Sequence, residues 1–200
     1  MIHSSFNRRI HMAAAIVLLA TLLMLFAFSA GSLPVVQKAG IDQDDSLYAN
    51  NEEAPGFLPL DVPLTADTQR QIYLLCREAC VPFEVEMSIL GHESDFDPDA
   101  VSDTDDHGIA QINRCNFGWL QEELGPIDFY DPIQCVRAGL RILGPLWARY
   151  GPHKALMAYN HGESGAKRKW DRGQATSEYS TNVLAQAEAY GWSMEVNIMT

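Results

Sequence analysis

One carboxyl group in this chain of 200 residues stands where a proton donor could work. Glu93 ends a run in which Phe83, Met87 and Leu90 recur at helical spacing. Glu93 continues this apolar stripe, so we expect its carboxyl on the buried side of a helix, where the helix meets a loop. Apolar surroundings raise the pKa of a carboxyl, and general acid catalysis needs a carboxylic acid that is still protonated near neutral pH. The alternative is a surface glutamate at a helix end.

Polar and aromatic side chains follow Glu93 in four ordered motifs. Glu93-Ser94 leads into a loop rich in turn-forming residues, 95–102, and then into the segment His-Gly-Ile-Ala-Gln-Ile-Asn at 107–113. Ala-Tyr-Asn follows at 158–160, and a late tyrosine, Tyr179, precedes an apolar helical pattern. Several motifs in a fixed order are a specific signal, whereas Glu-Ser alone would carry none.

These motifs resemble those of the lytic transglycosylases of the goose-lysozyme-like, or SLT, type, which cut the glycan strands of peptidoglycan. The resemblance covers about residues 76–190. The positions that match the family pattern are Glu93, Ser94, Phe96, Pro98, Ala100, Ser102, Gly108, Gln111, Ile112, Ala158, Tyr159, Asn160 and Tyr179.

The resemblance implies a lysozyme-like fold and a reaction with one acid/base residue. Glu93 would protonate the glycosidic oxygen between N-acetylmuramic acid and N-acetylglucosamine, and would then take a proton from the 6-hydroxyl, which closes into a 1,6-anhydro sugar. It implies neither a cofactor nor a metal. The residues expected to bind the glycan or orient Glu93 are Ser94, Gln111, Tyr159, Asn160 and Tyr179.

The chain departs from the family pattern at three positions. Ala110 stands where methionine is usual, which shortens one wall of the expected groove. His107 occupies a position that is frequently aromatic, and we interpret it as an exposed loop histidine. Pro145, after Gly144, is expected to kink or end a helix.

Three other functions fit parts of the pattern. A hydrolytic muramidase on the same fold would need a second carboxylate to activate water. A calcium-binding loop would use acidic residues at alternate positions, but Ala100 stands where such a loop needs glycine. A catalytically silent glycan-binding protein is the third. The candidate acids for the muramidase are Asp95, Asp97, Asp99, Asp103, Asp105 and Asp106, and those for the calcium loop are the same residues without Asp105.

The elements that must position these groups are helices. Thr65 is a candidate N-cap for a helix ending near Ala79, and Asp131-Pro132 marks another helix start. Further helices are expected from Asn113 to Leu124, from Pro152, and from a cap at Thr176. Patterns suited to strands are scarce, so the fold class is mainly α, with the catalytic domain at residues 64–192 and a tail at 193–200.

The first 63 residues predict an anchor and a linker. Residues 12–30 are uncharged and apolar, and Arg8-Arg9 precede them, so residues 1–30 are expected to be a membrane anchor or a signal peptide. Residues 31–63 are acidic and carry four prolines, as in a disordered, solvated linker. The domain would then lie outside the cytoplasm, membrane-anchored or secreted, and its partners would be peptidoglycan and the membrane, with protein partners unknown.

Charge and cysteine content limit the remaining possibilities. The net charge of −12 argues against binding to nucleic acid, which needs basic patches. Four cysteines in an exported domain suggest disulfides, and three pairings are possible. Our hypothesis pairs Cys115 with Cys135, because they flank one predicted helix and its loop. Zinc is disfavoured because the chain has no CxxC pair and its histidines lack ligand spacing.

Overall fold

The computed structural model describes residues 54–194. The predicted anchor or signal peptide, most of the predicted linker and most of the tail therefore lie outside the described residues. Within the described range, none of the helices combines the length and the apolar character needed to cross a membrane.

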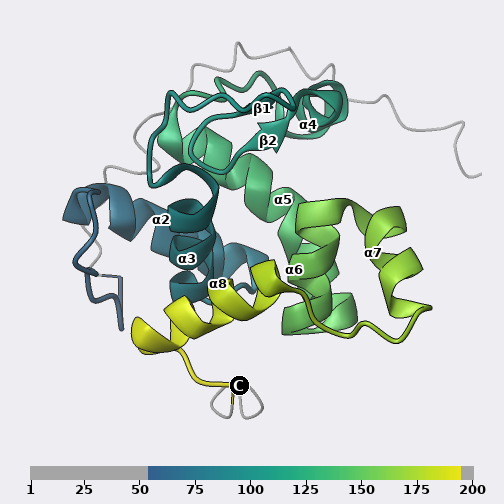
Figure 1. Cartoon of the computed structure of the whole chain (residues 1–200). Coiled ribbons are helices and arrows are strands. Elements are labelled where there is room, and N and C mark those ends of the chain that lie inside the picture. Colours follow the sequence, from purple (N-terminus) through teal and green to yellow (C-terminus); the bar gives the residue numbers. More distant parts are fainter. Residues whose placement is uncertain (1–53, 195–200) are drawn as a thin grey trace, which may run out of the picture. The chain divides into compact units, whose positions relative to one another are not determined.

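The described part of the chain is mainly helical, as the sequence predicts (Figure 1). Its one small sheet is an antiparallel pair, in which Asp106 pairs with Asn113 and His107 with Ile112. The elements in chain order are α2 Ala66–Ala79, α3 Phe83–Ser94, β1 Asp106–His107, β2 Ile112–Asn113, a 3₁₀ turn Arg114–Asn116, α4 Phe117–Leu124, α5 Pro132–Tyr150, α6 Pro152–His161, α7 Glu163–Trp170 and α8 Glu178–Ala189.

Helix α3 is the central element of this domain. It is buried on nearly all sides, and it packs against α2 and α8. A short helix surrounded by others in this way must be apolar all round, which explains the dense apolar run before Glu93. The helix ends at Asp95, whose backbone is left-handed (φ 53°) and whose N–H bonds to the carbonyl of Gly91. The end of α3 therefore delivers Glu93 to the boundary between core and solvent.

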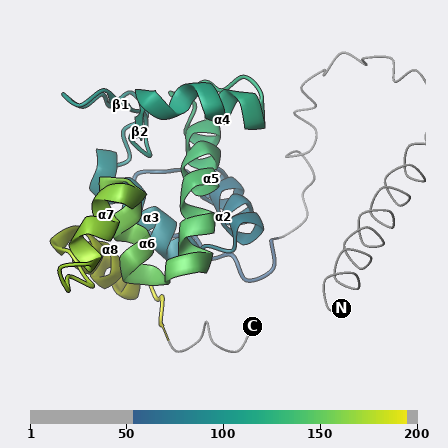
Figure 2. The same ribbon diagram turned by 90° about the vertical axis from the view of Figure 1, so that its right-hand side faces the viewer.

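Helix α5 runs the length of the domain, with α4 across one end and α6 packed beside it (Figure 2). Pro145 was expected to kink or end this helix, and it does not end it, because α5 continues through Gly144-Pro145. Gly144 is buried against α2, where an added Cβ would lie 3.0 Å from the carbonyl oxygen of Ala79. Packing on α2 and α6 therefore stabilises α5 on both sides of Pro145, although proline supplies no N–H to the helix.

The β1–β2 hairpin is held against the loop that precedes α5 by a close backbone contact. Gly108, at its turn, has φ 73°, and a Cβ there would lie 1.9 Å from the carbonyl oxygen of Phe129. His107 is only 6% exposed, so its interpretation as an exposed loop residue is wrong. Its ring nitrogens hydrogen-bond with the Tyr130 hydroxyl (2.9 Å) and the Asp105 carboxylate (2.7 Å), which offsets the cost of burying a polar ring.

The four cysteines are free thiols, so the hypothesis that Cys115 pairs with Cys135 is wrong. Cys115 is exposed within the short 3₁₀ turn, whereas Cys135 is buried and donates to the carbonyl oxygen of His107 (3.7 Å). Flanking the same helix and loop in sequence did not bring the two sulfur atoms together. Cys76 is buried and Cys80 is exposed.

We expect thiol titration to separate the four cysteines by exposure. Without reductant, an aromatic disulfide reagent should react with Cys80 and Cys115 in the native protein, and with Cys76 and Cys135 only after unfolding, because buried thiols are inaccessible and burial raises their pKa. Fewer than four reactive thiols in denaturant would contradict this prediction and point to a disulfide.

Candidate active site

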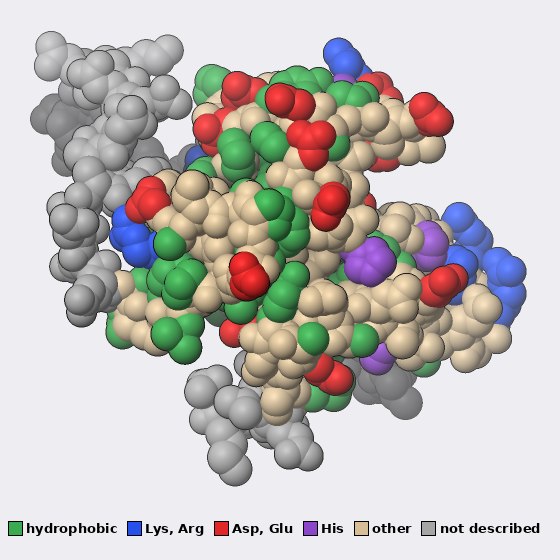
Figure 3. Space-filling model, turned by 60° about the vertical axis from the view of Figure 1, so that its left-hand side comes forward, with side chains coloured by type: hydrophobic (Ala, Val, Ile, Leu, Met, Phe, Trp, Pro, Cys, Tyr) green, Lys and Arg blue, Asp and Glu red, His purple; other side chains and the backbone are tan. Residues whose placement is uncertain are grey.

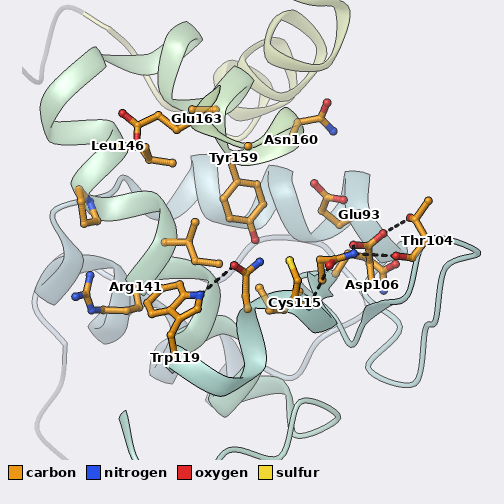
Figure 4. A pocket seen from close by; sticks show the side chains of 18 of the residues that line it. Glu93, Thr104, Asp106, Cys115, Trp119, Arg141, Leu146, Tyr159, Asn160 and Glu163 are labelled. Atoms are coloured by element: carbon orange, nitrogen blue, oxygen red, sulfur yellow. Dashed lines mark hydrogen bonds between the residues drawn. The ribbon is translucent and has the colours of Figure 1, made fainter. Parts of the chain in front are cut away.

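A cleft of about 770 Å³ opens between the β1–β2 side of the domain and helices α5 to α7. Glu93 lies at one end and Trp119, with Arg141, at the other (Figure 4). Figure 3 shows the surface hollowed between an upper part, where Asp and Glu side chains gather, and a lower part with His, Lys and Arg side chains. Other lining residues are Thr104, Asp106, Gln111, Ile112, Asn113, Cys115, Asn116, Ile142, Pro145, Leu146, Arg149, Ala158, Tyr159, Asn160, Gly162 and Glu163.

The Glu93 carboxyl is held by a tyrosine from the far end of the chain. The Tyr179 hydroxyl donates to Glu93 Oε1 at 2.6 Å, and Tyr179 lies in the first turn of α8, which packs on α3. The helix is started by Ser177, one residue later than the predicted cap at Thr176, through a capping box with Ser180. This cap therefore fixes the point at which Tyr179 meets Glu93.

The environment of Glu93 favours its protonated form. Burial raises the pKa of this carboxyl, the Tyr179 hydrogen bond lowers it, and the negative charge of Asp106 raises it again; the net shift is upward. A carboxyl of this kind keeps its proton closer to neutral pH and can donate it in the cleft.

Asp106 lines the same cleft but lies in a polar environment. Its Oδ2 accepts from the hydroxyls of Ser102 (2.6 Å) and Thr104, and its Oδ1 accepts from Asn113 Nδ2 (2.8 Å). Partial burial acts to raise the pKa of Asp106, but these three hydrogen bonds outweigh that effect, and the net shift is downward. The cleft therefore contains two carboxyl groups whose pKa values are pushed in opposite directions.

Gln111 and Tyr159 both line the cleft and are both fastened to the backbone of the hairpin region. Gln111 Nε2 donates to the carbonyl oxygens of Gly108 (2.8 Å) and Ala100 (3.1 Å), and the Tyr159 hydroxyl donates to that of Ala110 (3.0 Å). Both hydrogens of the Gln111 amide nitrogen are thus used, which leaves its amide oxygen for a ligand.

The other two predicted site residues have different positions. Asn160 is exposed and lines the cleft at the end of α6. Ser94 does not line it; its hydroxyl donates to the carbonyl oxygen of Ile109 (2.8 Å) and so ties the end of α3 to the hairpin. Tyr179 does not line the cleft either, and it reaches the site through its hydrogen bond to Glu93.

Sequence reasoning missed the far wall of the cleft. This wall is formed by residues of α5 at intervals of four, Arg141, Pro145 and Arg149, which line the cleft together. Their spacing could have indicated that they share one face of the helix. The Arg141 guanidinium lies 6.0 Å from the centre of the Trp119 ring and pairs with Glu123 at 2.5 Å. This end offers an aromatic face and cationic groups in an acidic chain.

Glu86 is a second feature that the sequence analysis passed over. It lies two turns before Glu93 on α3, is 1% exposed, and its Oε1 has no hydrogen-bond partner within residues 54–194. Burial raises the pKa of Glu86 to about 8, with a further contribution from the charge of Glu93. Its place on the stripe between Phe83 and Leu90 was the available signal.

The acidic loop after α3 does not form a metal site in the described range. Within residues 54–194, no group of three His, Cys, Asp or Glu side chains has the arrangement of metal ligands. Asp95, Asp97, Asp99 and Asp103 are exposed, and the Asp106 oxygens are taken up by hydroxyl and amide donors. The loop geometry therefore gives no support to the calcium-binding alternative.

We expect Glu86 to make stability depend on pH. The Glu86 pKa is about 8 in the folded protein against 4.5 for the free side chain, so the folded state binds more protons between these values and the free energy of unfolding falls as pH rises through that window. Glu86→Met should lose this part of the pH slope and be more stable than the wild type at pH 8 by at least about 1 kcal/mol. Urea unfolding at pH 5 and pH 8 measures both; an unchanged slope would count against the assignment.

We expect Tyr179→Phe to raise the pKa of Glu93. The lost hydrogen bond stabilises the carboxylate, so its removal shifts the titration of the Glu93 carboxyl to higher pH. Carbon-13 NMR of labelled glutamate measures this directly. Tyr190→Phe, which removes a hydroxyl at the other end of α8, should leave the Glu93 titration in place, and equal shifts in both variants would refute the specific role of Tyr179.

Comparison with protein families matches residues 77–183, just over half of the chain, to the transglycosylase SLT domain. Among solved structures, an inactive mutant of the lytic transglycosylase Slt from Pseudomonas aeruginosa superposes with a TM-score of 0.52 at 20% sequence identity. The match covers 64% of this chain and 24% of that chain, so it shows a shared fold over about a quarter of the Slt protein. Comparison with curated proteins gives no match. With more than half of its length matched, including the segment that carries Glu93 and the hairpin, this chain belongs to the transglycosylase SLT domain family.

Proposed function

We propose that this protein is a peptidoglycan lytic transglycosylase, with Glu93 as its single general acid and base. The observation that carries the proposal is the placement of Glu93. Its carboxyl lies in a cleft of about 770 Å³, its pKa is raised by burial, and the Tyr179 hydroxyl holds it at 2.6 Å. Membership of the SLT domain family supports peptidoglycan as the substrate.

The proposed reaction begins with proton transfer from Glu93 to the oxygen that joins N-acetylmuramic acid to N-acetylglucosamine. The bond between that oxygen and the anomeric carbon breaks, and its electron pair stays on the oxygen. The anomeric carbon becomes electron-poor, as in other glycoside cleavages. The Glu93 carboxylate then accepts a proton from the 6-hydroxyl, whose oxygen bonds to the anomeric carbon and closes the 1,6-anhydro ring. Glu93 is protonated again, and no water is consumed.

The walls of the cleft fit a chain of acetamido sugars. The free amide oxygen of Gln111 would accept from an acetamido N–H, and the exposed amide of Asn160 would bond to a sugar hydroxyl or acetamido group. Tyr159 would present its ring as a wall for the sugar, and Trp119 a stacking face farther along. Ser94 would act indirectly, by fixing the end of α3 beside the hairpin.

The cellular setting is proposed from the family and the sequence. Peptidoglycan lies outside the cytoplasm, so the domain would act there, with residues 1–30 as an anchor or export signal and 31–63 as a spacer that lets it reach the wall. A glycan-binding role without catalysis is a weaker alternative, because Glu93 keeps the burial and the tyrosine contact that proton donation needs.

We expect the full chain to release fragments from purified peptidoglycan that are lighter by one water than their reducing-end counterparts. Glu93→Gln, which cannot donate the proton, should lower the rate by about 10²- to 10⁴-fold. The Pseudomonas aeruginosa Slt structure is itself that of an inactive mutant with glutamine in place of a glutamate. Mass spectrometry of the released muropeptides is the measurement.

The matched control is Glu188→Gln, an exposed glutamate near the end of α8, which should cleave like the wild type. Products with reducing ends would instead favour the hydrolytic alternative. Unchanged cleavage by Glu93→Gln would remove Glu93 from the mechanism.

A further inference from the structure

Asp106 stands apart from the other acids of its loop because it is built into the cleft. Asp95, Asp97, Asp99 and Asp103 are exposed and do not line the cleft, whereas Asp106 lines it together with Glu93 (Figure 4). It begins β1, and its backbone pairs with Asn113 on β2. The hairpin therefore fixes its position, while the neighbouring acids follow a solvated loop.

The hydrogen bonds of Asp106 hold a carboxylate in place. Every side-chain group that bonds to it is a donor: the hydroxyls of Ser102 and Thr104 on Oδ2, and the amide of Asn113 on Oδ1. Three donors aimed at two oxygens stabilise the charged form, and they also restrain the group from moving to form a bond of its own. The site thus presents a fixed negative charge.

The negative charge of Asp106 affects the protonation of Glu93. Asp106 and Glu93 line the same cleft, and the negative charge of Asp106 adds to the effect of burial in raising the pKa of Glu93. When two carboxyls in one site have different surroundings, one pKa can be raised and the other lowered. The carboxyl with the raised pKa is suited to donate a proton, and the other is suited to remain ionised beside developing positive charge.

We propose that Asp106 is a second catalytic carboxylate of this cleft, whose fixed negative charge stabilises the electron-poor anomeric carbon while Glu93 protonates the leaving oxygen. The proposal rests on the proposed function. In a site with one acid/base residue, the acetamido group of the substrate has to stabilise the positive centre alone; here the protein shares that task. The bonds that break and form are the same as in the proposed reaction, and none forms to Asp106. The anomeric carbon loses its positive charge when the 6-hydroxyl oxygen bonds to it and closes the ring.

The test compares Asp106→Asn with Asp103→Asn in the full chain acting on purified peptidoglycan. Both variants remove one negative charge from the same loop, but Asp103 is exposed and outside the cleft. We expect Asp106→Asn to lower kcat by about 10²-fold or more, with KM changed by no more than about threefold, because the charge acts in the transition state. Asp103→Asn should match the wild type.

Two further measurements separate charge from structure. Thr104→Val removes one hydrogen bond to Asp106 but leaves its charge, and should cost no more than about fivefold in kcat. Molar sodium formate should raise the rate of Asp106→Ala at least about tenfold by restoring an anion in the vacated space, and should leave Asp103→Asn unaffected. A loss caused by a distorted hairpin would appear equally in Thr104→Val and would not respond to formate.

The outcomes for Asp106 and for the proposed function are distinguishable. If Glu93→Gln is inactive but Asp106→Asn keeps the wild-type kcat, the proposal for Asp106 is wrong and the proposed function stands. If the wild type releases no fragments, the proposed function fails. The role of Asp106, which rests on that function, then fails with it. Where the wild type does release fragments, the pKa of Glu93 measured by carbon-13 titration should fall in Asp106→Asn, and an unchanged titration would contradict the proposal.

Discussion

The burial of α3 is the constraint on which the rest of this domain depends. A helix enclosed by α2 and α8 must carry apolar side chains on almost every face, yet its last turn carries Glu93. The left-handed residue Asp95 stops the helix at that point. Glu93 therefore sits where desolvation is strong enough to raise its pKa while its carboxyl still borders the cleft. Moving the glutamate by one position along the helix would turn its carboxyl by about 100° around the helix axis.

Contacts from distant parts of the chain maintain this arrangement. Tyr179 reaches Glu93 from α8, Ser94 bonds to the hairpin, and Tyr159 bonds to Ala110 from α6. Each of these hydrogen bonds joins a different element to the end of α3 or to the hairpin beside it. A site held from several sides in this way is preorganised, which is where much of an enzyme's electrostatic effect comes from.

Three carboxyl groups, Glu86, Glu93 and Asp106, show how local surroundings set protonation. Glu86 is fully buried, one of its oxygens has no hydrogen-bond partner among residues 54–194, and its pKa rises to about 8. Glu93 is partly buried with one hydrogen-bond donor, and its pKa is raised. Asp106 has three donors and partial exposure, and its pKa is lowered. The order follows from desolvation, which favours the neutral acid, against donated hydrogen bonds, which favour the carboxylate.

Local patterns explain the expectations that held and those that did not. Thr65 caps α2 and Asp131 caps α5, because a cap depends on a few adjacent residues. Helix α7 was not predicted, because Ala166 is its only buried residue and it has no apolar stripe to detect. The expectation for Pro145 considered only the local cost of a proline inside a helix, whereas α5 also packs against α2, at Gly144. The expectation that His107 is exposed was wrong because its two hydrogen-bond partners, Asp105 and Tyr130, come together with it only in the folded chain.

The sequence by itself determined the mainly α fold class, the ordered motifs of the SLT domain and the identity of Glu93 as the candidate acid. Helical periodicity and caps depend on neighbouring residues, and the order of the motifs can be read directly along the sequence. Only the tertiary structure decided that Asp106, among six candidate acids, enters the cleft, that Ser94 turns toward the hairpin, and that the cysteines stay apart. Those outcomes depend on where separate elements pack, because burial and hydrogen-bond partners come from residues far away in the chain.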